Sequence, residues 1–138
     1  WKGCSPTIQE SVQGSQDAES EIGARSAKLL STALSLEPNN VHVLLNYGTL
    51  MEDWAQNFAL AKEIYRKALR IDPENLNVVA YFSKALRKEG QYEKATALLK
   101  RTLAKNPTDQ TLKREMWRVN EQVRQENLNK ASSSGHPI

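Results

Sequence analysis

The sequence has little of what catalytic and metal sites need. Its 138 residues include one cysteine, Cys4, and two histidines, His42 and His136. A single thiol cannot form an internal disulfide, and these three residues lie too far apart in the sequence to suggest a metal site. No HExxH, GxSxG or phosphate-binding glycine loop occurs. The sequence therefore predicts a protein that is not an enzyme and holds no cofactor or metal.

Long apolar runs are also absent. No stretch approaches the roughly 18 apolar residues of a membrane span. With 39% apolar residues, 25% charged residues and a mean hydropathy of −0.63, the composition is that of a soluble domain. Because the chain begins with Trp1 and not with Met, we expect a fragment or a processed chain. The compartment is not assigned by the sequence, although the lone thiol favours a reducing one inside the cell.

The net charge of +3 is unevenly spread along the chain. Residues 76–107 carry seven basic and two acidic groups, and the rest of the chain is close to balance. Nucleic-acid binding normally needs a broad basic stripe, so this local excess argues against it. An acidic segment in a protein or peptide partner fits the excess better.

What the sequence does have is a repeat. Pro38, Pro73 and Pro107 are 35 and 34 residues apart, and each closes an apolar run with helical spacing. Self-similarity at this period predicts a stack of helix pairs, and not one globular core. The predicted helices are 17–36, 41–54, 58–71, 76–89, 92–105 and 108–129, the last with Thr108 as its N-cap.

The apolar residues of the first predicted helix fall on one face, with the three-and-four spacing of a buried surface. We expect this face to be buried, and it consists of Ile22, Ser26, Leu29, Leu30, Ala33, Leu34 and Leu36. Outside the helices, we expect an irregular arm over residues 1–16 and a flexible tail over residues 130–138.

The repeated residues resemble the tetratricopeptide repeat (TPR), whose pattern is W-x2-L-G-x2-Y, then A-x3-F and P. The second pair has Leu44-x2-Tyr47-Gly48-x2-Met51, then Ala61-x3-Tyr65, Ala68 and Pro73. The third pair has Val79-x2-Phe82-Ser83-x2-Leu86, then Ala95-x3-Leu99 and Pro107. In the first helix, Ser26-x3-Leu30-x2-Ala33 resembles the second half of a repeat.

The resemblance implies an all-α solenoid of about two and a half repeats with a C-terminal capping helix. A half repeat then covers 17–38, repeats cover 41–73 and 76–107, and the cap covers 108–129. Together they make one TPR-like domain, 17–129. The outer side of the first helix has no partner helix, so we expect the N-terminal arm or another protein to cover it.

In the TPR family the first helix of each pair lines a concave groove that commonly holds an extended peptide. Mapped onto this sequence, that geometry predicts a partner-binding groove, with a solvated charged face as the alternative. Its residues are Asn46, Thr49, Asn77, Tyr81, Lys84, Arg87 and Lys88.

Three tryptophans are candidate interface anchors, because tryptophan is enriched at interaction hot spots. They are Trp1, Trp54 and Trp117. For Trp117, packing against the third repeat is the alternative.

The leading hypothesis is a non-catalytic interaction module, a scaffold or adaptor in a larger assembly. It would bind through the concave groove and the N-terminal edge. A permanent structural subunit held by its terminal arms is the second hypothesis, and an RNA-binding repeat is the third. A co-chaperone is a further alternative. Co-chaperone TPR domains hold the C-terminal carboxylate of a chaperone with a set of groove residues, and of these only Asn46 matches. Asn77 and Tyr81 stand where a lysine and an arginine are needed.

The alignment itself can be tested at Ala95, which it places where paired helices approach closely. We expect Ala95→Arg to unfold the third pair, because it forces a charge and excess volume into a close contact. The expected loss of stability is several kcal/mol, roughly 3 or more. A thermal melt measures it, and an unchanged melt would contradict the alignment at this position.

Overall fold

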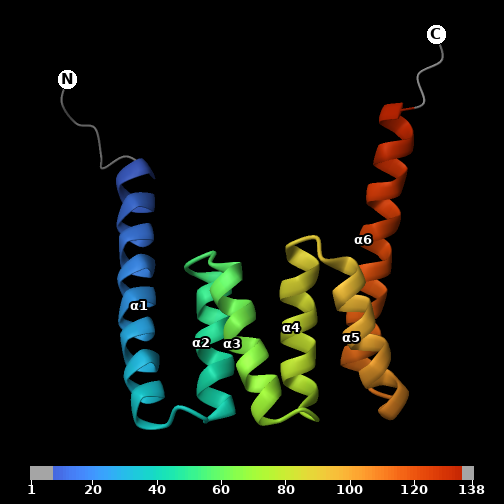
Figure 1. Cartoon of the computed structure of the whole chain (residues 1–138). Coiled ribbons are helices and arrows are strands. Elements are labelled where there is room, and N and C mark those ends of the chain that lie inside the picture. The colour runs from blue at the N-terminus through green and yellow to red at the C-terminus, as the bar shows by residue number, and fades with distance from the viewer. Residues whose placement is uncertain (1–7, 135–138) are drawn as a thin grey trace, which may run out of the picture.

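The structure, a computed structural model, describes the backbone of residues 8–134 and the side chains of residues 17–133. Within this part of the chain it contains α-helices and no strand. The helices are α1 (Ile8–Leu36), α2 (Val41–Asp53), α3 (Phe58–Ile71), α4 (Leu76–Lys88), α5 (Tyr92–Lys105) and α6 (Gln110–Ser134). Consecutive helices run antiparallel and contact one another along the stack (Figure 1). The predicted all-α solenoid of helix pairs is confirmed.

The first helix of each pair begins in the same way after a proline. Asn40, Asn75 and Asp109 each lie two residues after a proline. Their side-chain oxygens accept hydrogen bonds from the backbone N–H three residues later, at 2.8 to 3.2 Å, and so cap α2, α4 and α6. The predicted cap Thr108 is therefore wrong, since the cap of α6 is Asp109. Counting from these caps gives equivalent positions in the three helices.

Within each pair, a small residue on one helix receives a large residue from the other. A Cβ built on Gly48 of α2 would lie 2.5 Å from Cε1 of Tyr65, so the ring lies directly on the α2 backbone. Ser83 occupies the same position in α4, and Tyr65 and Leu99 are both fully buried. This alternation of small and large residues is the packing that the repeat pattern predicts.

Both end helices are longer than predicted. α1 begins at Ile8, so residues 8–16 are helical and the predicted irregular arm is wrong there. Between Ile8 and Leu36 no proline interrupts the hydrogen-bond ladder, and a helix can continue without burying a face. Likewise α6 has no glycine or proline and continues to Ser134, beyond the predicted end at 129. Residues 1–7 and 135–138 lie outside the described residues.

α1 buries only part of the predicted face. Leu34 packs against the core as predicted, together with Ala27, which was not predicted, whereas Ile22, Leu29 and Leu36 are exposed. The reason is that α1 contacts α2 and no other helix among the described residues. Its contact with α2 instead includes Gly23, where a Cβ would lie 2.2 Å from Nε1 of Trp54.

The close approach at Gly48 gives a test of the packing. We expect Gly48→Ala to lower the free energy of unfolding by about 1–3 kcal/mol, because the new methyl group overlaps the Tyr65 ring. Chemical denaturation measures the change.

Ser83→Ala is the matched control at the equivalent position of α4. The buried Ser83 hydroxyl has no hydrogen-bond partner among the described residues, so its removal should be neutral or slightly stabilising. Equal losses in the two variants would contradict this account of the two helix pairs.

Candidate binding surface on the concave face

The first helices of the pairs form the inner side of the stack. α2 contacts α4, and α4 contacts α6, whereas within residues 8–134 no contact joins α3 to α5. Because the first helices lie closer together than the second helices, the stack curves with α2, α4 and α6 on its concave side. We call their exposed side the concave face.

All seven predicted groove residues belong to α2 or α4, the first helices of the two inner pairs. Asn46 and Asn77 are exposed, and Thr49 and Lys84 are half-buried. The Thr49 hydroxyl donates to the carbonyl oxygen of Leu45 at 2.7 Å, so its hydrogen is used within α2.

Tyr81 presents an aromatic surface on this face. Its side chain is 37% exposed, and its ring stacks on Tyr65 with centroids 6.2 Å apart and an interplanar angle of 22°. The stack fixes the orientation of the Tyr81 ring before anything binds. A rigid, partly exposed ring is suited to packing against an apolar side chain of a ligand.

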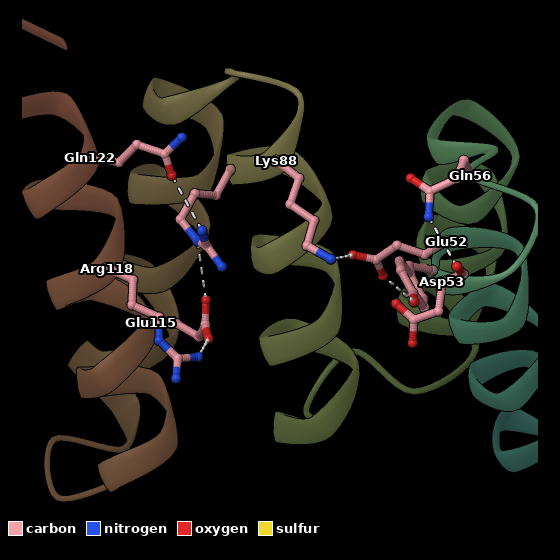
Figure 2. Close-up of polar contacts among 9 residues, drawn as sticks. Glu52, Asp53, Gln56, Lys88, Glu115, Arg118 and Gln122 are labelled. Atoms are coloured by element: carbon pink, nitrogen blue, oxygen red, sulfur yellow. Dashed lines mark hydrogen bonds and ion pairs between the residues drawn. The ribbon is translucent and has the colours of Figure 1, made fainter. Parts of the chain in front are cut away.

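Lys88 is tied to the neighbouring first helix. Its Nζ lies 3.2 Å from Oε1 of Glu52 on α2, a carboxylate whose side chain is fully buried (Figure 2). The other oxygen of Glu52 accepts a hydrogen bond from the Tyr65 hydroxyl at 3.0 Å. An isolated buried carboxylate would be strongly destabilising, so both partners are needed to keep Glu52 inside.

Arg87, the residue before Lys88, is tied in the opposite direction. Its Nη1 donates to Oε1 of Gln122 on α6 at 3.2 Å, and its Nε lies 3.6 Å from Oε2 of the buried Glu115. Arg118 donates to the other oxygen of Glu115 at 2.6 Å (Figure 2). Two adjacent cations on α4 thus hold α2 on one side and α6 on the other.

This arrangement leaves a different set of cations for a ligand from the one that the sequence predicts. Within residues 17–133, no ion pair or side-chain hydrogen bond engages the side chain of Lys84 or Arg114. The guanidinium of Arg118 forms an ion pair with Glu115, but the Arg118 side chain is 46% exposed. The sequence analysis missed both α6 residues. The signal was present, because Arg118 lies 34 residues after Lys84 and nine after its own cap.

The structure gives the tryptophans different environments. Trp54 lies against Gly23 of α1, so at least part of its ring serves the internal packing. Trp117 is 64% exposed on α6, and its role as an anchor stays a prediction. Trp1 lies outside the described residues.

The pKa of the buried Tyr65 is shifted by its surroundings. Burial raises the pKa of Tyr65 above its ordinary value, and the nearby Glu52 raises it further. At the surface, the hydrogen bond to Glu126 raises the pKa of Tyr92. Burial is thus the main cause of the shift at Tyr65, and a hydrogen bond to a carboxylate is the main cause at Tyr92. In the described part of the chain, no group of three or more acidic, histidine or cysteine side chains is placed to hold a metal ion.

Comparison with known proteins agrees with this geometry. A sequence profile of the tetratricopeptide repeat matches residues 55–114, which cover α3 to α5 and the start of α6. The crystal structure of the Sgt2 TPR domain from Aspergillus fumigatus superposes with a TM-score of 0.66 over 97% of this chain and 88% of that chain, at 16% identity. Residues 55–114 therefore match the tetratricopeptide repeat family, and the chain has the fold of a TPR domain.

TPR domains are generally non-catalytic modules for protein–protein interaction. The first TPR domain of Spaghetti (RPAP3), solved with the HSP90 peptide SRMEEVD, has the same fold with a TM-score of 0.65 at 14% identity, over 80% of this chain and 87% of that one. Over 56 residues the chain is also 39% identical to the protein adenylyltransferase Fic of Drosophila mojavensis. This match covers 41% of the chain and only 11% of that protein. No helix among the described residues is long and apolar enough to cross a membrane.

The buried tie to Glu52 can be tested by removing one hydroxyl. We expect Tyr65→Phe to lower the free energy of unfolding by about 1–3 kcal/mol, because it leaves one oxygen of a buried carboxylate unpaired. Tyr92→Phe is the control, since Tyr92 donates to Glu126 at the surface and should cost less than about 1 kcal/mol. Urea unfolding of both variants measures the difference, and similar losses would contradict the buried role of Tyr65.

The same variant should also change the response to alkaline pH. Because the folded-state pKa of Tyr65 is raised, its contribution to stability is full below the unfolded-state pKa of about 10 and is lost as pH rises through the folded value. The wild-type protein should therefore lose stability more steeply above about pH 10 than Tyr65→Phe.

Proposed function

We propose that this chain is a non-catalytic adaptor or scaffold subunit of a larger assembly, and that it binds an extended, acidic peptide segment of a partner along its concave face. The N-terminal edge formed by α1 provides a second contact surface. The proposed peptide site rests on the cations of this face that remain available to a ligand, because internal ion pairs do not occupy them fully.

Those cations lie on neighbouring first helices at equivalent or nearby positions. Lys84 and Arg118 are each nine residues after their cap, and Arg114 lies one turn before Arg118. Carboxylates of a peptide crossing from α4 to α6 would meet them in succession. Charge-assisted hydrogen bonds of this kind are short and about twice as strong as neutral ones.

The remaining concave residues suit a peptide backbone and an apolar side chain. Asn46 and Asn77 carry exposed amides that can donate to and accept from a peptide group. Along α4, the stacked Tyr81 lies between Asn77 and Lys84. An acidic peptide with one apolar residue therefore matches the face better than a nucleic acid, which would need many phosphate contacts.

Solved TPR domains support the ligand class and not its identity. The Spaghetti domain holds an acidic heptapeptide, SRMEEVD, on the same fold. In the present chain Asn77 and Tyr81 replace the lysine and arginine that chaperone-tail clamps use, and only Asn46 is shared. We therefore propose a carboxylate-bearing segment that is recognised mainly by α4 and α6.

The test is peptide binding by fluorescence anisotropy. An array of acidic heptapeptides that includes SRMEEVD selects the tightest probe, and a version with Gln and Asn in place of Glu and Asp serves as its neutral counterpart. We expect the acidic probe to bind more tightly, and Lys84→Ala to weaken it about three- to tenfold, in line with the loss of one charged contact.

Lys67→Ala is the matched control, because Lys67 lies on α3, a second helix, and the substitution changes the net charge equally. Binding should weaken with added salt for wild type and less so for Lys84→Ala. If Lys84→Ala and Lys67→Ala weakened peptide binding equally, or if the neutral probe bound as tightly as the acidic one, a peptide site on the concave face would be contradicted.

A further inference from the structure

Two tyrosines from neighbouring helices connect the concave face with the interior of the stack. Tyr65 of α3 is fully buried, and Tyr81 of α4 is 37% exposed. The centroids of their rings lie 6.2 Å apart, and the ring planes are inclined by 22°. A stack at this separation is a favoured arrangement of two aromatic rings. The outer ring is therefore within reach of a ligand, whereas the inner ring is not.

The inner ring is fixed by α2 and by a buried ion pair. The ring of Tyr65 lies on the backbone of Gly48, and its hydroxyl donates to Oε2 of Glu52 at 3.0 Å. The other oxygen of Glu52 lies 3.2 Å from Nζ of Lys88 (Figure 2). Because a buried carboxylate that loses a partner is strongly destabilising, Tyr65 cannot move without cost. Tyr65 is therefore a rigid support for the ring of Tyr81.

The outer ring depends on that support for its orientation. Within residues 17–133, no side-chain hydrogen bond uses the Tyr81 hydroxyl, and the ring stacks on Tyr65. An exposed side chain that is free to change rotamer loses entropy when a ligand fixes it, which lowers the affinity by a factor of about two to ten. Because the stack already orients Tyr81, a ligand that packs on the exposed part of the ring avoids most of this loss.

The surroundings of Tyr81 favour an apolar side chain as the group that it contacts. Asn77 and Lys84 lie one turn before and one turn after it on α4, so polar groups border the exposed part of the ring. An aromatic ring can also bind a cation. Here Lys84 and Lys88 lie on the same side of α4 as the ring and would repel a lysine or arginine of the ligand.

We propose, on the basis of the peptide site inferred for this face, that Tyr81 is its specificity-determining residue and that Tyr65 is the positioning residue of Tyr81. Tyr81 selects peptides that carry an apolar residue close to their acidic ones. Tyr65 touches no ligand, because it is fully buried, and it acts through the stack.

Two labelled heptapeptides of equal charge measure this selectivity by fluorescence anisotropy. One is EEELEEE, and in the other alanine replaces the central leucine. Glutamates on both sides of the central residue allow it to reach Tyr81 in either direction of the peptide. We expect the wild-type protein to bind the leucine peptide about three- to tenfold more tightly, in line with one contact between neighbouring side chains.

Tyr81→Ala should reduce this ratio of affinities to less than about two, because it removes the ring that the leucine contacts. Lys84→Ala should weaken both peptides by a similar factor. A ratio near one in the wild-type protein, or an unchanged ratio in Tyr81→Ala, would overturn the role of Tyr81 while leaving the charge-based site intact. If neither peptide bound, or if Lys84→Ala weakened neither, the peptide site itself would be contradicted, and the role of Tyr81 with it.

Substitutions of Tyr65 test the positioning role. Leucine occupies the equivalent position of α5, at Leu99, so Tyr65→Leu is compatible with the repeat. It removes the inner ring, and we expect the ratio of affinities to fall towards that of Tyr81→Ala. Tyr65→Phe keeps the ring and loses only the hydroxyl, so its ratio should stay close to that of wild type although its stability is lower.

The comparison of these two variants separates positioning from stability, because both remove the hydrogen bond to Glu52. Circular dichroism confirms that each variant is folded at the temperature of the assay. If Tyr65→Leu is unfolded, the same two substitutions are compared in a Glu52→Gln background, which removes the buried charge. Equal ratios in the leucine and phenylalanine variants, whether retained or lost, would overturn the role of Tyr65.

Discussion

Two carboxylates buried between neighbouring first helices, Glu52 and Glu115, set the spacing and the electrostatics of the whole stack. Each carries a charge that would be costly in the interior without a partner. Lys88 supplies that partner to Glu52 from α4, and Arg87 supplies it to Glu115. Since both cations are on α4, this helix is held from two sides.

The same constraint separates the charges that hold the protein together from those that face solvent. The basic excess of the third repeat looks in the sequence like one ligand-binding patch. In the structure Arg87 and Lys88 neutralise internal acids, and Lys84 remains on the face with Arg114 and Arg118 of the capping helix. The concave face is therefore basic at its α4–α6 end, and α2 contributes chiefly the amide of Asn46.

Much of the fold could be predicted from local features because they repeat. The proline spacing located the helix boundaries, and small residues at Gly48 and Ser83 marked the close contacts between paired helices. The partners of Arg87 and Lys88 could not be predicted, because helical periodicity gives the side of a helix that a residue occupies and not the residue across from it. The lengths of α1 and α6 were missed for a different reason: their projecting segments bury little, so no apolar pattern marks them.

The contact between Gly23 and Trp54 has a consequence for how the chain tolerates sequence change. The indole rests on bare backbone, so the tilt of α1 depends on a residue that contributes no side chain at all. Any replacement at Gly23 would wedge the first helix away from its neighbour while leaving its hydrophobic spacing intact. A mutational scan should therefore find that Gly23 is among the least tolerant positions of α1. Helix propensity alone would predict the opposite, because glycine is unfavourable inside a helix.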